Sequence, residues 1–76
     1  MARSPARHFV VCVQNDGYAA SLETRKIYVA LRDKVAEQNG QLRIIDESGE
    51  DYLYPRALFG EIDLPQALKK AVLTAA

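Results

Sequence analysis

Tyrosines and basic residues alternate in two stretches of this sequence, and that combination could do recognition chemistry. Lys26 and Tyr28 share a face of one expected strand, and Arg43 and Tyr52 lie on either side of an acidic turn. Tyrosine rings can stack on unpaired bases while Arg and Lys contact phosphates, and the same rings can contact a protein or complete a small core. The candidate binding residues are Arg25, Lys26, Tyr28, Arg43, Tyr52, Tyr54, Pro55 and Arg56.

The residue types needed for catalysis are sparse. His8 is the only histidine and Cys12 the only cysteine, so neither a nucleophile with its base nor a three-ligand metal site can be assembled from them. We expect Cys12 to be a small buried apolar residue. We also expect no catalytic residue, no metal site and no cofactor. No glycine-rich phosphate loop is present, because the glycines are isolated at positions 17, 40, 49 and 60.

The acidic run of residues 46–51 (DESGED) fails as a calcium loop. Counting from Asp46, the sixth position would need glycine and holds Asp51, and the twelfth would need glutamate and holds Ala57. The sequence instead predicts a hairpin tip with solvated carboxylates.

Composition narrows the class of protein. The 76 residues make one domain, and ten basic and ten acidic residues cancel, so no global charge draws the chain to nucleic acid or to a membrane. A single cysteine favours a cytoplasmic location. The apolar run of residues 9–13 is too short to span a bilayer, and we expect no membrane association. Residues 1–7 (MARSPAR) are predicted to be a disordered arm.

The first half of the chain predicts two strands and a short helix. Residues 8–14 (HFVVCVQ) are apolar on both faces, which predicts a strand covered on both sides. Residues 23–31 form the second strand, in which Ile27, Val29 and Leu31 alternate with a second set that includes Tyr28. In residues 33–40, an aspartate cap and a terminal Asn-Gly pair predict one or two helical turns.

The second half predicts a hairpin, a 3₁₀ turn, a strand and a helix. The strands of the hairpin are residues 41–46 and 52–54, with Gly49 in the turn, and Pro55 is expected to end the ladder because it has no N–H. Residues 55–58 predict the 3₁₀ turn and residues 59–62 the last strand. A helix of about residues 64–75 follows, with a capping box formed by Asp63 and Gln66. Its apolar stripe comprises Leu64, Ala67, Leu68, Ala71, Val72 and Ala75; Lys69 and Lys70 face water, and Leu73 lies outside the stripe.

These elements predict a mainly β fold, a small five-stranded SH3-like half-open barrel over residues 8–76 with a C-terminal amphipathic helix that plugs one end or covers one sheet. Sm-like and oligonucleotide-binding barrels are the alternatives. The order of YLYP, RALF and the last strand resembles the hairpin and 3₁₀ ending of SH3-like barrels. SLETRKIY and RIIDESGEDYLYP also resemble a group of small uncharacterised bacterial proteins, from which no function is transferred.

Three functions remain open at this stage. The first is a non-catalytic binding or regulatory module for a protein partner, acting through Tyr52, Tyr54 and Pro55 or through an unpaired strand edge. The second is binding of RNA or single-stranded DNA by the tyrosines and basic residues. The third is a structural homo-oligomer, such as a homodimer held by a patch that includes Leu73.

Overall fold

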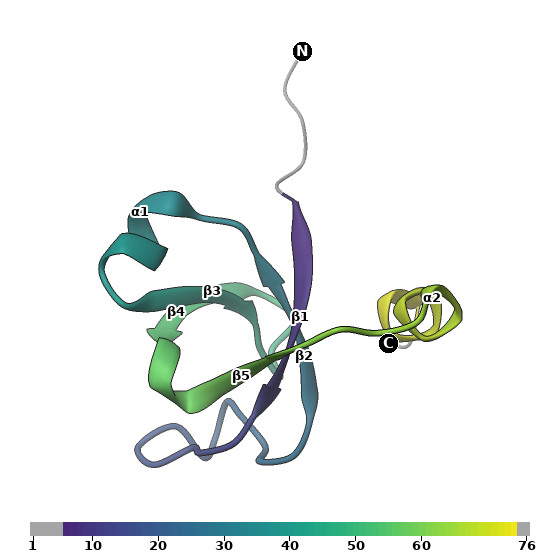
Figure 1. The fold of residues 1–76 in the computed structure, drawn as a ribbon. Coiled ribbons are helices and arrows are strands. Elements are labelled where there is room, and N and C mark those ends of the chain that lie inside the picture. The colour runs from purple at the N-terminus through teal and green to yellow at the C-terminus, as the bar shows by residue number, and fades with distance from the viewer. Residues whose placement is uncertain (1–5, 75–76) are drawn as a thin grey trace.

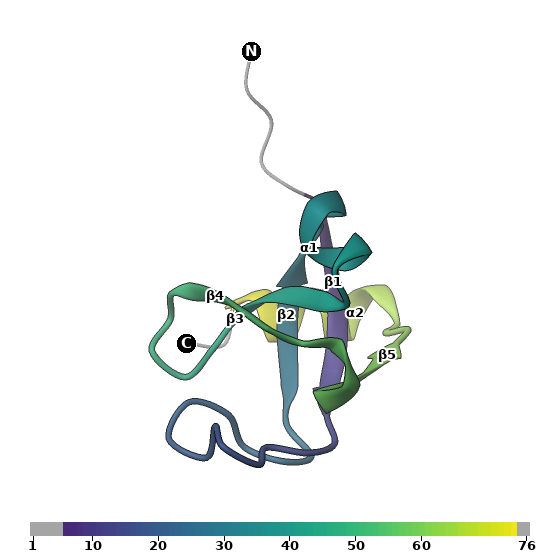
Figure 2. The same cartoon turned by 90° about the vertical axis from the view of Figure 1, so that its left-hand side faces the viewer.

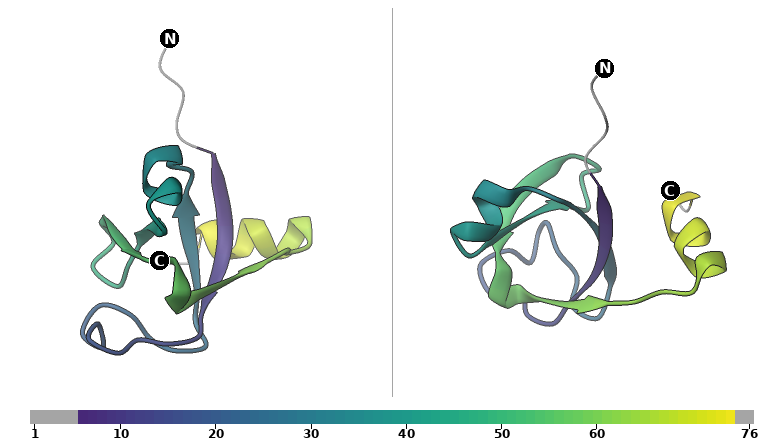
Figure 3. Two further views of the ribbon diagram at one scale, coloured as in Figure 1. Left: turned by 60° about the vertical axis from the view of Figure 1, so that its left-hand side comes forward. Right: turned by 45° about the horizontal axis from the view of Figure 1, so that its top comes forward.

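The protein is a five-stranded antiparallel barrel with a helix beside it (Figures 1 and 3). The computed structural model describes residues 6–74. The sheet order is β4-β3-β2-β1-β5, and the sheet is not closed, which confirms the predicted mainly β, half-open barrel. The elements are β1 (Arg7–Cys12), β2 (Ile27–Leu31), α1 (Lys34–Gln38), β3 (Gln41–Ile45), β4 (Asp51–Pro55), the 3₁₀ turn η1 (Arg56–Leu58), β5 (Phe59–Ile62) and α2 (Gln66–Thr74).

The turn chemistry of the sequence is confirmed at three places. The Asp33 carboxylate accepts the Ala36 N–H at 3.1 Å and caps α1. Gly49 takes a φ of +85° in the β3–β4 hairpin, a conformation that costs other residues more than glycine. β5 spans the predicted residues. The 3₁₀ turn ends where the sequence predicts but begins one residue later, with Pro55 immediately before it.

The core is one cluster inside the barrel. Leu22 contributes to it from the loop between β1 and β2, which lies at one end of the barrel (Figure 2). Cys12 is fully buried, as expected. The remaining members come from the five strands and the 3₁₀ turn, and they are Val10, Tyr28, Ala30, Leu42, Ile44, Tyr54, Leu58 and Phe59.

The first two strands are shorter than predicted, for backbone reasons. β1 ends at Cys12 because the N–H groups of Val13 and Gln14 both donate to one carbonyl, that of Leu58, as in a bulge. Val13 is therefore 59% exposed. β2 begins only at Ile27, since Arg25 has a φ of +68°, which no strand accommodates.

The binding role predicted for Tyr28 requires this residue to face outwards, and β2 has the opposite facing. Tyr28 and Ala30 point into the barrel and are 4% and 0% exposed. Ile27, Val29 and Leu31 lie on the outer face and are half-buried. Both faces of β2 are apolar enough to be covered, and the Tyr28 ring fills more of the interior than a branched aliphatic side chain would.

Residues 6 and 7, the end of the predicted N-terminal arm, are joined to the sheet. Arg7 is the first residue of β1, and the Ala6 carbonyl accepts the Arg32 N–H at 2.8 Å. Backbone pairing with the neighbouring strand therefore orders this part of the chain, and the prediction of disorder is wrong there. Residues 1–5 of the predicted arm lie outside the described part.

The last helix begins later than predicted, at Gln66. The Pro65 carbonyl accepts the Lys69 N–H at 3.0 Å, so Pro65 precedes the first turn. A residue before proline is disfavoured in helical conformation, so Leu64 precedes the helix, and Asp63 lies three residues before its first residue instead of at the cap. The predicted end of the helix at Ala75 lies outside the described residues.

The helix α2 lies outside the barrel, beside the outer face of β1 and β2, and does not plug an end (Figures 1 and 3). The residues on its barrel side include Lys69, which is half-buried, and Leu73. Leu68, from the middle of the predicted apolar stripe, is 52% exposed. Val72 of the stripe is half-buried and lines a hollow with Ile27 and Val29 of β2, so only part of the predicted stripe faces the barrel. Within residues 6–74, neither α1 nor α2 has the length and apolar character needed to cross a membrane.

The burial of Leu22 makes the β1–β2 loop part of the core. We expect Leu22→Ala to lower the free energy of unfolding by about 2–5 kcal/mol, because it removes buried methyl groups and leaves a cavity. Val13→Ala, at an exposed position of the same loop, should change it by less than about 0.5 kcal/mol. Urea unfolding of both variants measures this, and equal effects would mean that the loop does not belong to the core.

Candidate functional site

The eight predicted binding residues do not form one surface. Tyr28 and Tyr54 are buried in the core, where they cannot stack on a ligand. Pro55 and Arg43 are half-buried. The remaining four are exposed, and they are Arg25, Lys26, Tyr52 and Arg56.

The two buried tyrosines donate their hydroxyl protons to the carboxylates at the start of the hairpin turn. Tyr54 Oη donates to Asp46 Oδ2 at 2.6 Å, and Tyr28 Oη donates to Glu47 Oε2. The Ser21 carbonyl also accepts the Glu47 N–H at 3.1 Å, which ties the β1–β2 loop to the hairpin. Both carboxylates are thus structural. Asp46 is buried, so the prediction of solvated carboxylates is wrong for it, whereas Glu47 is exposed.

Hydrogen bonding sets the ionisation of these groups. Burial by itself would raise the pKa of Asp46, which is 7% exposed, but hydrogen bonds from Ser48 and Tyr54 outweigh burial and lower it. The Lys26 ammonium and the Tyr28 hydroxyl lower the pKa of Glu47. Burial, followed by the hydrogen bond to Glu47, raises the pKa of Tyr28.

Two of the candidate cations are already paired within the molecule. Lys26 Nζ lies 2.6 Å from Glu47 Oε2. The guanidinium of Arg43 bridges Asp33 at 2.9 Å and Asp51 at 3.0 Å. A phosphate would have to displace these carboxylates. Together with the burial of Tyr28, this weighs against nucleic-acid binding, which stays an untested prediction.

The structure does bring together a shallow aromatic depression between the β1–β2 loop and the hairpin. It has a volume of about 410 Å³, and its exposed walls are Tyr18, Tyr52 and Leu53, which are 37%, 50% and 41% exposed. Tyr18 packs edge-on against the Tyr54 ring at 5.2 Å between centroids. Sequence reasoning missed Tyr18, although an aromatic residue directly after the Asn-Asp-Gly turn was the available signal. We refer to this hollow as the tyrosine depression.

One edge of the depression is the open side of β4. Two backbone hydrogen bonds mark the ends of the β3–β4 ladder: the Asp46 N–H donates to the Glu50 carbonyl at 3.1 Å, and the Arg56 N–H donates to the Gly40 carbonyl at 2.9 Å. Hydrogen-bonded pairs alternate along an antiparallel ladder. Every second residue of β4 therefore directs its N–H and C=O away from β3, and no described strand pairs with that edge.

Leu53 is a residue whose N–H and C=O face this open edge. Pro55 occupies an equivalent position two residues later, where a missing N–H costs no hydrogen bond to β3. β4 ends at Pro55, as the sequence predicts, but the missing N–H is not the cause, because the Arg56 N–H still donates to the Gly40 carbonyl. The 3₁₀ turn ends β4 instead.

The potentially reactive groups lie apart from this surface and from each other. His8 and Cys12 are four residues apart on β1, about 13 Å at the usual rise of a strand. His8 Nδ1 lies 2.8 Å from Glu61 Oε1, and Cys12 Sγ donates to the Gln14 carbonyl at 3.2 Å. Among residues 6–74, no three His, Cys, Asp or Glu side chains gather in a way that could hold a metal ion.

No protein-family model, curated protein or solved structure matches this chain. The resemblance to small bacterial SH3-like barrel proteins therefore stays a prediction, and the surface has to be interpreted from its own chemistry.

The lowered pKa of Asp46 predicts a specific dependence of stability on pH. A carboxylate whose pKa is lower in the folded state stabilises the fold above the pKa of the unfolded chain, about 3.9, and loses this effect as the pH falls through the folded value. We expect Asp46→Asn to lower the free energy of unfolding by about 1–3 kcal/mol at pH 7, and by clearly less at pH 3.

Urea unfolding at both pH values measures this difference. The exposed Glu50 is the control, since Glu50→Gln should have a small effect that is similar at pH 7 and pH 3. If Asp46→Asn costs the same at the two pH values, the Asp46 carboxylate does not carry the predicted stabilisation.

Proposed function

We propose that the protein is a non-catalytic, cytoplasmic binding module that takes an extended segment of a partner protein along the open edge of β4. The supporting observation is the coincidence of an unpaired strand edge with the tyrosine depression. In strand addition, backbone hydrogen bonds supply affinity and pockets for alternate side chains supply specificity. Leu53 offers the backbone groups, and the depression offers the pocket.

The walls of the depression suit a protein ligand. Tyr18 and Tyr52 are large side chains with few rotatable bonds, so ordering them on binding costs little entropy. Tyr18 is further held by its edge-on contact with the buried Tyr54. The volume of about 410 Å³ accommodates one large side chain of the partner, such as leucine, proline or phenylalanine.

The negative charge of two carboxylates at the depression favours a basic residue in the bound segment. Asp46 lines it, and the Tyr52 hydroxyl donates to Glu50 Oε2 at 3.1 Å. Neither carboxylate has a cationic partner within 4 Å among the described residues, whereas Asp51 is neutralised by Arg43. A Lys or Arg next to the anchoring side chain would meet this unbalanced negative charge.

The open edge can be tested by removing a single N–H. Leu53→Pro deletes the donor that faces outwards and leaves the β3–β4 ladder intact, as Pro55 already does two residues away. Leu53→Ala removes the side chain and keeps the donor. With a peptide selected from a random twelve-residue display library, we expect Leu53→Pro to weaken binding at least about tenfold, and Leu53→Ala by less.

A third variant examines the pocket. Tyr52→Ala should weaken the same peptide by about tenfold or more, because it removes one wall of the depression. Fluorescence anisotropy with the labelled peptide gives the affinities, and an amide NMR spectrum verifies that each variant is folded. The proposal fails if the library yields no specific peptide, or if selected peptides bind all three variants as they bind the wild type.

A structural homo-oligomer is the second candidate, and one observation favours it. The exposed side of α2 carries the apolar residues Ala67, Leu68 and Ala71, which the barrel does not cover. Two copies could cover these stripes by antiparallel packing of their α2 helices.

The mass of the protein in solution tests this candidate. Light scattering coupled to size exclusion should give a dimer that Leu68→Glu returns to a monomer, because a charge in the stripe would be desolvated by helix packing. Val35→Glu, at another exposed apolar position on α1, is the matched control. A wild-type monomer at all accessible concentrations would eliminate the homo-oligomer.

A further inference from the structure

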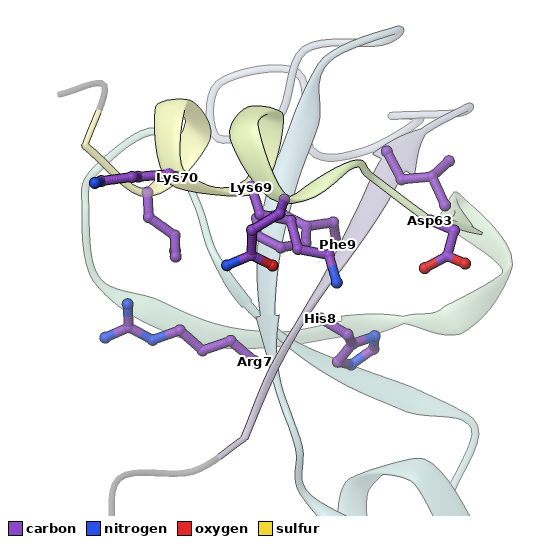
Figure 4. A pocket seen from close by; sticks show the side chains of 9 residues that line it. Arg7, His8, Phe9, Asp63, Lys69 and Lys70 are labelled. Carbon is purple, nitrogen blue, oxygen red and sulfur yellow. The ribbon is translucent and has the colours of Figure 1, made fainter.

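A second hollow lies between α2 and the outer face of the barrel, away from the tyrosine depression (Figure 4). Its volume is about 350 Å³. Phe9 and Ile62 contribute apolar surface from β1 and β5, and Leu73 contributes it from α2. From α2 the hollow also receives polar side chains, because Gln66, Lys69 and Lys70 line it, whereas Ala67, Leu68 and Ala71 are exposed.

Positive charge gathers at this hollow although the chain as a whole is neutral. Its lining includes three cationic side chains, Arg7, Lys69 and Lys70, and one carboxylate, Asp63. Within 4 Å, no described residue forms an ion pair with Arg7 or Lys69. In this respect both differ from Lys26 and Arg43, which are neutralised by nearby carboxylates.

Lys69 is a half-buried cation, which is unusual for a lysine without an ion-pair partner among the described residues. Lys69 comes from the side of α2 that faces the barrel and is half-buried. A lysine stem can cover apolar surface while its ammonium stays at the rim. The guanidinium of Arg7 is a planar fork that matches the two oxygens of a carboxylate, and it reaches the same hollow from β1.

We propose that this hollow binds a small amphipathic carboxylate, an apolar chain or ring of about eight carbons with one acidic end. The apolar part would lie against Phe9, Ile62 and Leu73, and the carboxylate would lie between Arg7 and Lys69. The volume is at the lower end of the range of about 300–1,000 Å³ that is usual for small-molecule sites, which excludes a long lipid chain. This inference is independent of the protein-binding function proposed for β4.

A titration of the whole chain with octanoate tests the site. We expect saturable shifts of the amide NMR signals of Phe9, Ile62 and Leu73, weakened by salt. Octanol and octyltrimethylammonium have the same chain without the negative charge and should bind at least about fivefold more weakly. Acetate has the charge without the chain and should not saturate. Equal binding of octanoate and octanol, or of octanoate and acetate, would overturn the proposal.

Two lysine variants distinguish binding in this hollow from attraction by the net charge of the protein. Lys69→Gln should weaken octanoate binding about threefold or more, whereas Lys34→Gln, an exposed lysine at the start of α1, should leave it unchanged. Equal effects of the two substitutions would assign binding to net charge and overturn the site.

A final experiment distinguishes binding of a free amphiphile from binding to a membrane surface. Vesicles of phosphatidylglycerol present anionic head groups but keep their chains in the bilayer. Two results together support the proposal: octanoate binds saturably, and the protein does not co-sediment with the vesicles. Co-sedimentation without saturable octanoate binding would mean that the cations of α2 meet a lipid surface, and it would overturn the small-molecule site.

Discussion

Two hydrogen bonds from tyrosine hydroxyls to carboxylates organise this small barrel. Tyr54 donates to Asp46 and Tyr28 donates to Glu47, so the start of the hairpin turn is joined to β2 and β4. Hydrogen bonds to charged groups contribute about 1.5–3 kcal/mol each, a large share of the stability of a 76-residue domain. They also allow two large rings to fill an interior whose other members are mostly smaller aliphatic residues.

The sequence was most informative where single residues fix the backbone. Gly49 located the hairpin turn, Asp33 located the start of α1, and the proline after YLY located the 3₁₀ turn. Alternation was less informative about β2, because both of its faces are apolar enough to be covered and a period of two does not say which face points inwards. The wrong choice placed Tyr28 outside and created a stacking surface that the fold does not have.

The candidate site was harder to predict, because its defining contacts join residues far apart in sequence. Tyr28 and Glu47 are 19 residues apart, and nothing local marks the carboxylate as the partner of that hydroxyl. The same holds for Tyr18, which reaches the depression only because its loop folds over the barrel and buries Leu22. Of the predicted tyrosines, Tyr52 alone remains on the exposed surface, since it is nearest to the hairpin turn.

The two proposed surfaces use opposite sides of one rigid core. The β3–β4 hairpin and α2 lie on either side of β1 and β2, so an extended peptide at β4 would not touch a carboxylate held beside α2 (Figure 1). The ion pairs explain why their chemistry differs: carboxylates near the hairpin pair with Lys26 and Arg43, whereas no described carboxylate lies within 4 Å of Arg7 or Lys69. Coupling between the sites would require a second arrangement of the packed core. The tyrosine hydrogen bonds oppose such a rearrangement, so the two surfaces should bind their ligands independently.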